Sequence, residues 1–220
     1  MKHYIKTVII ILAGAILLSA CSKPADIANE TTVITYEDGD EMSLSIIDFK
    51  SSDCFRNAKW GMTASDLKSS EYNQSNFADL DDETICTSYI YGEITVSASY
   101  HLRDGALRRI SLILDTPDDY TEEDIVQLYN TISAEISETN GSSNEHMKLK
   151  EDDYIEGLDD ETNQKLTDGS PEKEYIKTWT NDTTKIELFR SYYSESESFS
   201  GNVIPAHQSI SVAYSDINLS

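Results

Sequence analysis

The chain has 220 residues, of which 40 are Asp or Glu and 17 are Lys or Arg, so its formal net charge at pH 7 is −23. A surface this acidic repels nucleic acid and anionic lipid head groups, and we predict no nucleic-acid partner. The length is that of a single domain with one hydrophobic core.

The N-terminal residues have the pattern of an export signal. Lys2 and Lys6 precede an unbroken apolar stretch at 8–18. A permanent membrane-spanning helix needs roughly 20 apolar residues, so this stretch is too short to be one. We predict a signal peptide at 1–20, which is not part of the fold.

The tetrapeptide Leu18-Ser19-Ala20-Cys21 follows directly. It resembles the lipobox of bacterial lipoproteins. The resemblance implies cleavage before Cys21 and lipid on its sulfur, and two or three acyl chains on one residue anchor a protein durably. We therefore expect a lipoprotein held on a cell membrane and facing outside the cytoplasm, at the cell surface or in the periplasm.

Residues 21–50 are expected to form the lipidated cysteine, a flexible tether and a hairpin. Small polar residues at 22–31 are typical of a spacer. Apolar runs at 32–36 and 42–47 flank Asp38-Gly39, a pair that favours a tight turn. The alternative is that this hairpin sequence belongs to the tether.

Two further cysteines, Cys54 and Cys86, lie in the exported part. Outside the cytoplasm they could form a disulfide, which would stabilise the fold by roughly 3–4 kcal/mol. Two separate buried thiols are the alternative, because spacing alone does not prove a bridge. Neither cysteine has a neighbouring histidine, so we predict no nucleophilic catalysis by them.

Two helices are predicted from one repeated capping pattern. Thr63 and Thr121 can each cap a helix N-terminus, and Asp66 and Asp124 stand three residues later, where they can bond back to the cap. The second helix has the stronger pattern. Its apolar stripe consists of Ile125, Leu128, Tyr129, Ile132 and Ile136, and Asn140-Gly141 provides its end.

Each predicted helix is followed by three predicted strands. The first set is 84–91, 93–102 and 106–114, and the second is 174–180, 184–191 and 208–214. The short turns between them favour antiparallel pairing. We therefore predict an α+β domain at 51–220 with an antiparallel sheet and two helices packed on one face. The order is compatible with a duplicated αβββ unit or with two units of independent origin.

An acidic insertion is expected at 142–173, between the two sets. This stretch is rich in Glu, Asp, Ser and Asn and poor in aromatic residues, so it can bury little surface. A surface loop is the simpler interpretation, and a ligand-binding lid is the alternative.

The compact motif Phe55-Arg-x-x-x-Trp60-Gly61-Met62-Thr63 resembles small exported bacterial proteins of uncharacterised function. More distantly, the helix-on-sheet plan resembles the SmpA/OmlA-type outer-membrane assembly lipoproteins and the β-lactamase inhibitor proteins. Both act by binding other proteins, and the resemblance therefore implies a binding module. Packing of Phe55 and Trp60 beneath the first helix explains the motif without a direct binding role.

The sequence lacks the common motifs of catalytic, phosphate-binding and zinc-binding sites. It contains no Gly-x-Ser-x-Gly elbow, no phosphate-binding glycine loop and no His-Glu-x-x-His pair. The acidic clusters at 79–83, 115–119 and 151–161 lack the order of ligands in a helix-loop-helix calcium site, so we predict no metal and no cofactor. A lone histidine on a strand, such as His101, is more often structural than catalytic.

We therefore expect a lipoprotein without catalytic activity that binds a protein or another envelope component and is attached to the membrane through Cys21. The alternative is an exported hydrolase or carbohydrate-acting enzyme that uses paired carboxylates, which would need a deep acidic pocket.

Overall fold

The computed structural model describes residues 31–35, 41–51, 54–70, 76–117, 119–150, 170–197 and 203–218. It contains a ten-stranded sheet, a two-stranded sheet and two helices. The strands are β1 (Thr31–Thr35), β2 (Glu41–Ile46), β3 (Ala78–Asp79), β4 (Thr84–Tyr91), β5 (Ile94–Arg103), β6 (Ala106–Asp115), β7 (Asn144–Leu149), β8 (Lys173–Thr180), β9 (Thr184–Tyr193), β10 (Ser196–Glu197), β11 (Val203–Ile204) and β12 (His207–Asp216); the helices are α1 (Ala64–Ser70) and α2 (Glu122–Asn140). The predicted mixture of helices with a mostly antiparallel sheet is confirmed, and the chain is richer in strand than expected.

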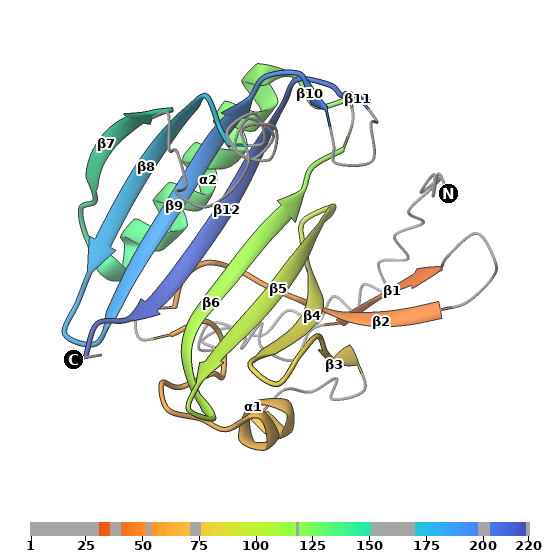
Figure 1. Ribbon diagram of the computed structural model, residues 1–220, viewed down its shortest axis with the longest axis vertical. Helices are drawn as coiled ribbons and strands as arrows, with labels where there is room; N and C mark the ends of the chain where they lie inside the picture. Colours follow the sequence, from red (N-terminus) through yellow and green to blue (C-terminus); the bar gives the residue numbers. More distant parts are fainter. Residues whose placement is uncertain are drawn as a thin grey trace, which may run out of the picture.

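The strand order of the large sheet is β1-β2-β4-β5-β6-β12-β9-β8-β7, and β3 also pairs with β4 (Figure 1). All neighbours are antiparallel except β2 and β4, which share a short parallel pairing. The hairpin formed by β1 and β2 joins the sheet through this pairing. The six strands predicted from alternation therefore lie between two edges, β1–β2 on one side and β7 on the other.

Both predicted helix starts are present. At α1, Thr63 Oγ1 accepts from the backbone N–H of Asp66 at 3.2 Å, and the Asp66 carboxylate accepts from the backbone N–H of Thr63 at 3.3 Å. Thr121 and Asp124 make the same reciprocal bonds at α2, and Gly141 ends that helix with a φ of 76°. Capping of this kind satisfies N–H groups that have no partner within the helix.

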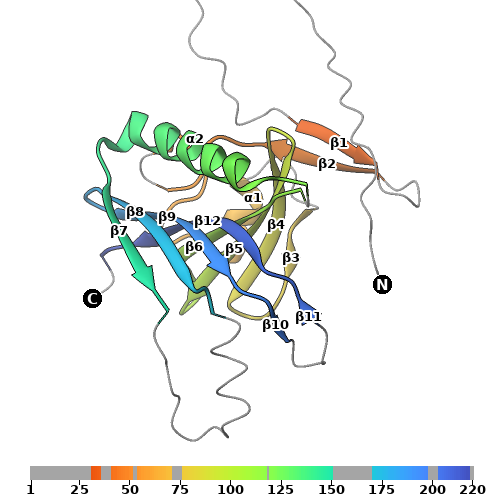
Figure 2. The same cartoon turned by 90° about the horizontal axis from the view of Figure 1, so that it is seen from above.

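The two helices cover the sheet unequally. Helix α2 lies across one face of β8, β9 and β12 (Figure 2). Helix α1 is only seven residues long, buries Leu67 as its one fully buried side chain, and lies beyond the lower ends of β5 and β6 in Figure 1. Two helices were predicted to pack on one face, and both are present, but α2 provides most of the helical cover. Residues 47–51 and 54–62 form a largely non-helical cover over the rest of that face.

The hydrophobic core lies between the sheet and this cover. Alternate residues of β5, from Ile94 to Leu102, are buried as the sequence pattern predicted. The opposite face of the central strands carries small polar side chains, among them Ser97, Ser99 and Ser111. This alternation of apolar and polar residues explains why one face is covered and why no described helix packs on the other.

The region expected to be an acidic insertion at 142–173 contains the edge strand β7. All six residues of β7 are exposed, so its sequence lacks the apolar alternation by which a strand is predicted. Backbone pairing with β8, from Asn144↔Thr178 to Leu149↔Lys173, defines it instead. The rest of the expected insertion, 151–169, lies outside the described residues.

Candidate functional site

The cysteines singled out by the sequence do not form a site. Cys21 and residues 1–20, where a signal peptide is predicted, lie outside the described residues. Cys54 is buried in the core, whereas Cys86 lies on the other face of the sheet, with its sulfur 3.5 Å from Ser99 Oγ. Cys54 and Cys86 are not joined to each other, and their positions on opposite sides of the sheet give no geometry for a bridge.

Phe55 and Trp60 of the sequence motif have packing roles. Phe55 is fully buried, and its ring meets Tyr89 edge-on at a centroid distance of 5.5 Å. Trp60 is half-buried, and its indole N–H donates to Thr184 Oγ1 at 2.8 Å. Trp60 therefore connects the cover to the start of β9, and the motif is accounted for by the fold.

The described residues offer no metal centre. Among them, no three His, Cys, Asp or Glu side chains gather as metal binding would require. His101 lies on β5 opposite Arg109 of β6, and burial together with the Arg109 charge lowers the pKa of its imidazole. Such a histidine stays neutral near pH 7, in keeping with a structural role.

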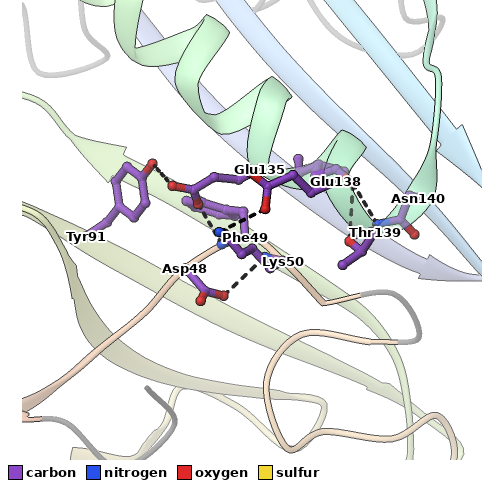
Figure 3. Close-up of polar contacts among 9 residues, drawn as sticks. Asp48, Phe49, Lys50, Tyr91, Glu135, Glu138, Thr139 and Asn140 are labelled. Atoms are coloured by element: carbon purple, nitrogen blue, oxygen red, sulfur yellow. Dashed lines mark hydrogen bonds and ion pairs between the residues drawn. The ribbon is translucent and has the colours of Figure 1, made fainter. Parts of the chain in front are cut away.

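A shallow hollow with a network of carboxylates lies on the outer side of α2. It is bordered by Lys50, Glu135 and Glu138 (Figure 3). Glu135 accepts from the Tyr91 hydroxyl at 2.9 Å and from the Phe49 backbone N–H at 3.1 Å. Lys50 and Glu138 form an exposed ion pair at 2.9 Å.

This network has the character of a structural clamp. Both Glu135 oxygens already accept hydrogen bonds, one from β4 and one from the cover, so the carboxylate ties those segments to α2. Burial and, next, the bond to Glu135 raise the pKa of the Tyr91 hydroxyl, which keeps it protonated as the donor. The hollow is open to solvent and is not the deep acidic pocket that the enzyme alternative needs.

A different cluster lies between α2 and the outer strands. Register places Tyr175 of β8 opposite Arg190 of β9, and Lys173 opposite Tyr192. The cluster comprises Tyr129 of α2, Lys173, Tyr175 and Lys177 of β8, and Arg190 and Tyr192 of β9. We call these six residues the basic-aromatic strip.

Arg190 is at the centre of the basic-aromatic strip. Its guanidinium carbon lies 4.5 Å from the ring centre of Tyr175, 5.1 Å from that of Tyr192 and 5.7 Å from that of Tyr129. A cation over an aromatic face is attracted by the ring quadrupole. The Nε and Nη1 atoms of Arg190 are buried, and within the described part of the chain they have no hydrogen-bond partner.

The two lysines of the strip are also held by neutral groups. The Lys173 ammonium lies 4.5 Å from the Tyr175 ring centre, and that of Lys177 lies 5.0 Å from the Tyr129 ring centre. Lys177 also donates to Ser133 Oγ at 3.1 Å. None of the three cations forms an ion pair with a described carboxylate, although Lys50, Lys68, Arg108, Lys150 and Lys185 all do.

The acids nearest the strip do not neutralise it. Glu122 at the start of α2 accepts from the Tyr192 hydroxyl at 3.0 Å, and burial followed by that bond raises the pKa of Tyr192. Glu145 of β7 is opposite Lys177 in the register, and after burial its charge is the main influence that raises the pKa of Tyr129. Among the described residues, the strip brings three cations together beside two flanking acids, in a chain of net charge −23.

Comparison with known protein families, curated proteins and solved structures finds no match to this chain. Neither of the two described helices has the length and apolar character that crossing a membrane requires.

The basic-aromatic strip is not evident from the sequence. Its residues are spread from Tyr129 to Tyr192, and only the pairing of β8 with β9 beneath α2 brings them together. The signal that could have found it is the alternation Lys173-x-Tyr175-x-Lys177, which places two cations and one ring on the same face of a strand.

Proposed function

We propose that this chain is a bacterial lipoprotein, anchored to a cell membrane through lipid on Cys21, whose domain binds another protein or envelope component and has no catalytic role. The tetrapeptide Leu18-Ser19-Ala20-Cys21 supports the anchor. The observation that carries the binding role is the basic-aromatic strip, because none of its cations forms an ion pair with a carboxylate in the described part of this acidic chain. Arg and Tyr are also the residue types enriched at the energetic centres of protein interfaces.

The resemblance of the helix-on-sheet plan to SmpA/OmlA-type and β-lactamase-inhibitor domains agrees with this proposal, since those proteins act by binding other proteins. The rival function is hydrolysis by paired carboxylates. Its best candidates, Glu135 and Glu138, are already engaged by Tyr91, Phe49 and Lys50. Their engagement favours the binding role.

We further infer that the domain arose from a duplicated αβββ unit. The strands β4-β5-β6 and β8-β9-β12 each follow a helix that begins with Thr-x-x-Asp. In the sheet the first set reads β4-β5-β6 and the second reads β12-β9-β8, so the two sets meet at the antiparallel pair β6–β12. This order supports two related units about an approximate twofold axis.

The anchor is tested by metabolic labelling of the cells with a palmitate analogue. We expect label on the wild-type chain and on Cys54→Ala, and loss of label from Cys21→Ala. Label on Cys21→Ala, or its absence from the wild type, would contradict lipid attachment at Cys21.

The binding role is tested by affinity capture from detergent-solubilised envelopes of the producing cells, with the full chain as bait and mass spectrometry as readout. We expect one partner at a constant ratio to the bait. Charge reversal by Lys173→Glu is expected to abolish capture, whereas Lys148→Glu, on the other face of the neighbouring strand, is expected to preserve it. Failure of the wild type to capture any component at low and at moderate salt would contradict the proposal.

A further inference from the structure

Two exposed apolar side chains extend the basic-aromatic strip toward the edge of the sheet. Met147 and Leu149 of β7 are 50% and 58% exposed. Register places Met147 opposite Tyr175 and Leu149 opposite Lys173, and residues directly opposite on antiparallel strands point to the same face. The apolar pair therefore lies beside the strip, on the α2 side of the sheet.

The polar part of this surface matches a carboxylate. The guanidinium of Arg190 lies against the rings of Tyr129, Tyr175 and Tyr192, and its Nε and Nη1 atoms are buried. Arg190 therefore attracts an acidic side chain through its charge and not through a direct paired hydrogen bond. Lys173 adds a partly exposed cation, whose ammonium lies 4.5 Å from the Tyr175 ring centre.

We infer that the basic-aromatic strip, together with Met147 and Leu149, is the docking site for a segment of a partner protein in which an acidic side chain stands beside apolar ones. This inference rests on the proposed binding function and names the chemistry of the partner. Charge complementarity selects the acidic side chain, and the exposed Met147 and Leu149 select its apolar neighbours. A highly charged polyanion fits less well, because the net charge of −23 repels it at longer range.

The test uses the full chain in detergent with isotope-labelled methionine methyl groups, observed by NMR. The probe is a blocked Leu-Glu-Leu tripeptide, and the matched control is Leu-Gln-Leu. We expect the Met147 methyl signal to shift with the glutamate peptide and the signals of Met42 and Met62 to stay in place. Equal shifts with the two peptides, or no shift of Met147, would overturn the inference.

Two variants test which lysine charge is responsible for binding the glutamate peptide. Lys173→Gln is expected to weaken the glutamate peptide by about fivefold, as for a partly exposed ion pair. Lys148→Gln removes a charge from the edge strand β7, but on the face of the sheet opposite to the strip. We expect this variant to bind the glutamate peptide as the wild type does. Equal weakening by both variants would show a general charge effect and would overturn the assignment.

Other occupants give different results. A dimer of the chain alone in sedimentation that Met147→Ser dissociates would make a second copy the occupant. Stronger binding to vesicles with anionic lipid than to neutral vesicles, lost in Lys173→Gln, would make a membrane the occupant. Either result overturns the inference. If affinity capture recovers a partner equally well with Lys173→Glu, the inference fails while the proposed function stands.

Discussion

The half of the sheet beneath α2 and the half beneath residues 47–51 and 54–62 differ in how their apolar face is closed. Both begin from the same Thr-x-x-Asp cap, but α1 has 7 residues and α2 has 19. The first half is closed by irregular chain that buries Phe49 and Phe55. The second is closed by one straight helix, which leaves the outer part of β8 and β9 to tyrosines and cations.

The difference indicates where binding can develop on this fold. The irregular chain of residues 47–51 and 54–62 buries its large apolar side chains, such as Phe49 and Phe55, in the core. These side chains are therefore not available to a partner. Helix α2 packs on β8, β9 and β12 through one buried stripe. The residues of the basic-aromatic strip on β8 and β9 lie beside that stripe and keep partial exposure.

The largest expected effect is a difference in the free energy of unfolding between variants of the two tryptophans, Trp179 and Trp60. Trp179 is 1% exposed, and its indole N–H donates to Gly141 O at 3.1 Å. We expect Trp179→Ala to lower the free energy of unfolding by about 3–5 kcal/mol. Trp60→Phe keeps most of the packing and loses one hydrogen bond, for about 1 kcal/mol. Urea denaturation measures both, and equal losses would contradict the unequal closure of the two halves.

The second largest effect is expected at Glu135, whose hydrogen bonds join α2 to β4 and to the cover formed by residues 47–51 and 54–62. Glu135→Ala leaves the Tyr91 hydroxyl and the Phe49 N–H without their acceptor, and we expect a loss of about 1–3 kcal/mol. The exposed neighbour Glu138 serves as the control, because its ion pair with Lys50 is open to solvent and its loss is expected to cost much less than the loss of Glu135. A cost for Glu138→Ala that equals the cost for Glu135→Ala would argue against a clamp.

The two caps provide a matched pair of smaller effects. Thr121→Ala is expected to cost about 1 kcal/mol, since α2 depends on its N-terminus to hold four buried positions of its apolar stripe. Thr63→Ala should cost less, because α1 contributes only Leu67 as a fully buried side chain. Thermal unfolding of the two variants measures the difference, and the reverse order would show that α1 is the more important cover.

Alkaline pH should weaken the contact between the halves. Burial and the bond to Glu135 raise the pKa of Tyr91 above its ordinary value of 10.0. A raised folded-state pKa gives stability that is complete below the unfolded value and is lost as pH rises through the folded value. We expect the melting temperature to fall above about pH 10 and to fall less in Tyr91→Phe. An identical fall in both proteins would exclude Tyr91 as a contributor.

The strip itself should contribute little to folding. Lys173→Gln removes a half-exposed cation that forms no ion pair with a described carboxylate, and we expect the free energy of unfolding to change by less than about 0.5 kcal/mol. Chemical denaturation checks this expectation. A larger loss would mean that Lys173 serves the fold and would weaken the distinction between the closed part of the sheet and the strip.

The sequence was informative where side chains alternate between core and solvent. The strands β4, β5, β6, β8, β9 and β12 and both helix caps were predicted because each buries a regular pattern or uses a local hydrogen bond. Strand β7 was missed because backbone pairing alone defines it, and the parallel contact of β2 with β4 depends on chain far apart in sequence. The strip was missed for the same reason, since Tyr129, Tyr175 and Arg190 are neighbours only after folding.

The most direct test of the account compares the two faces of the sheet in living cells. A photo-crosslinking amino acid is placed at Leu149, beside the strip, or at Ile113, which is 52% exposed on the opposite face. We predict one discrete crosslinked protein from position 149, lost when Lys173→Gln is added, and none from position 113. Crosslinking from position 113 alone, or from position 149 without any dependence on Lys173, would contradict a binding role for the strip.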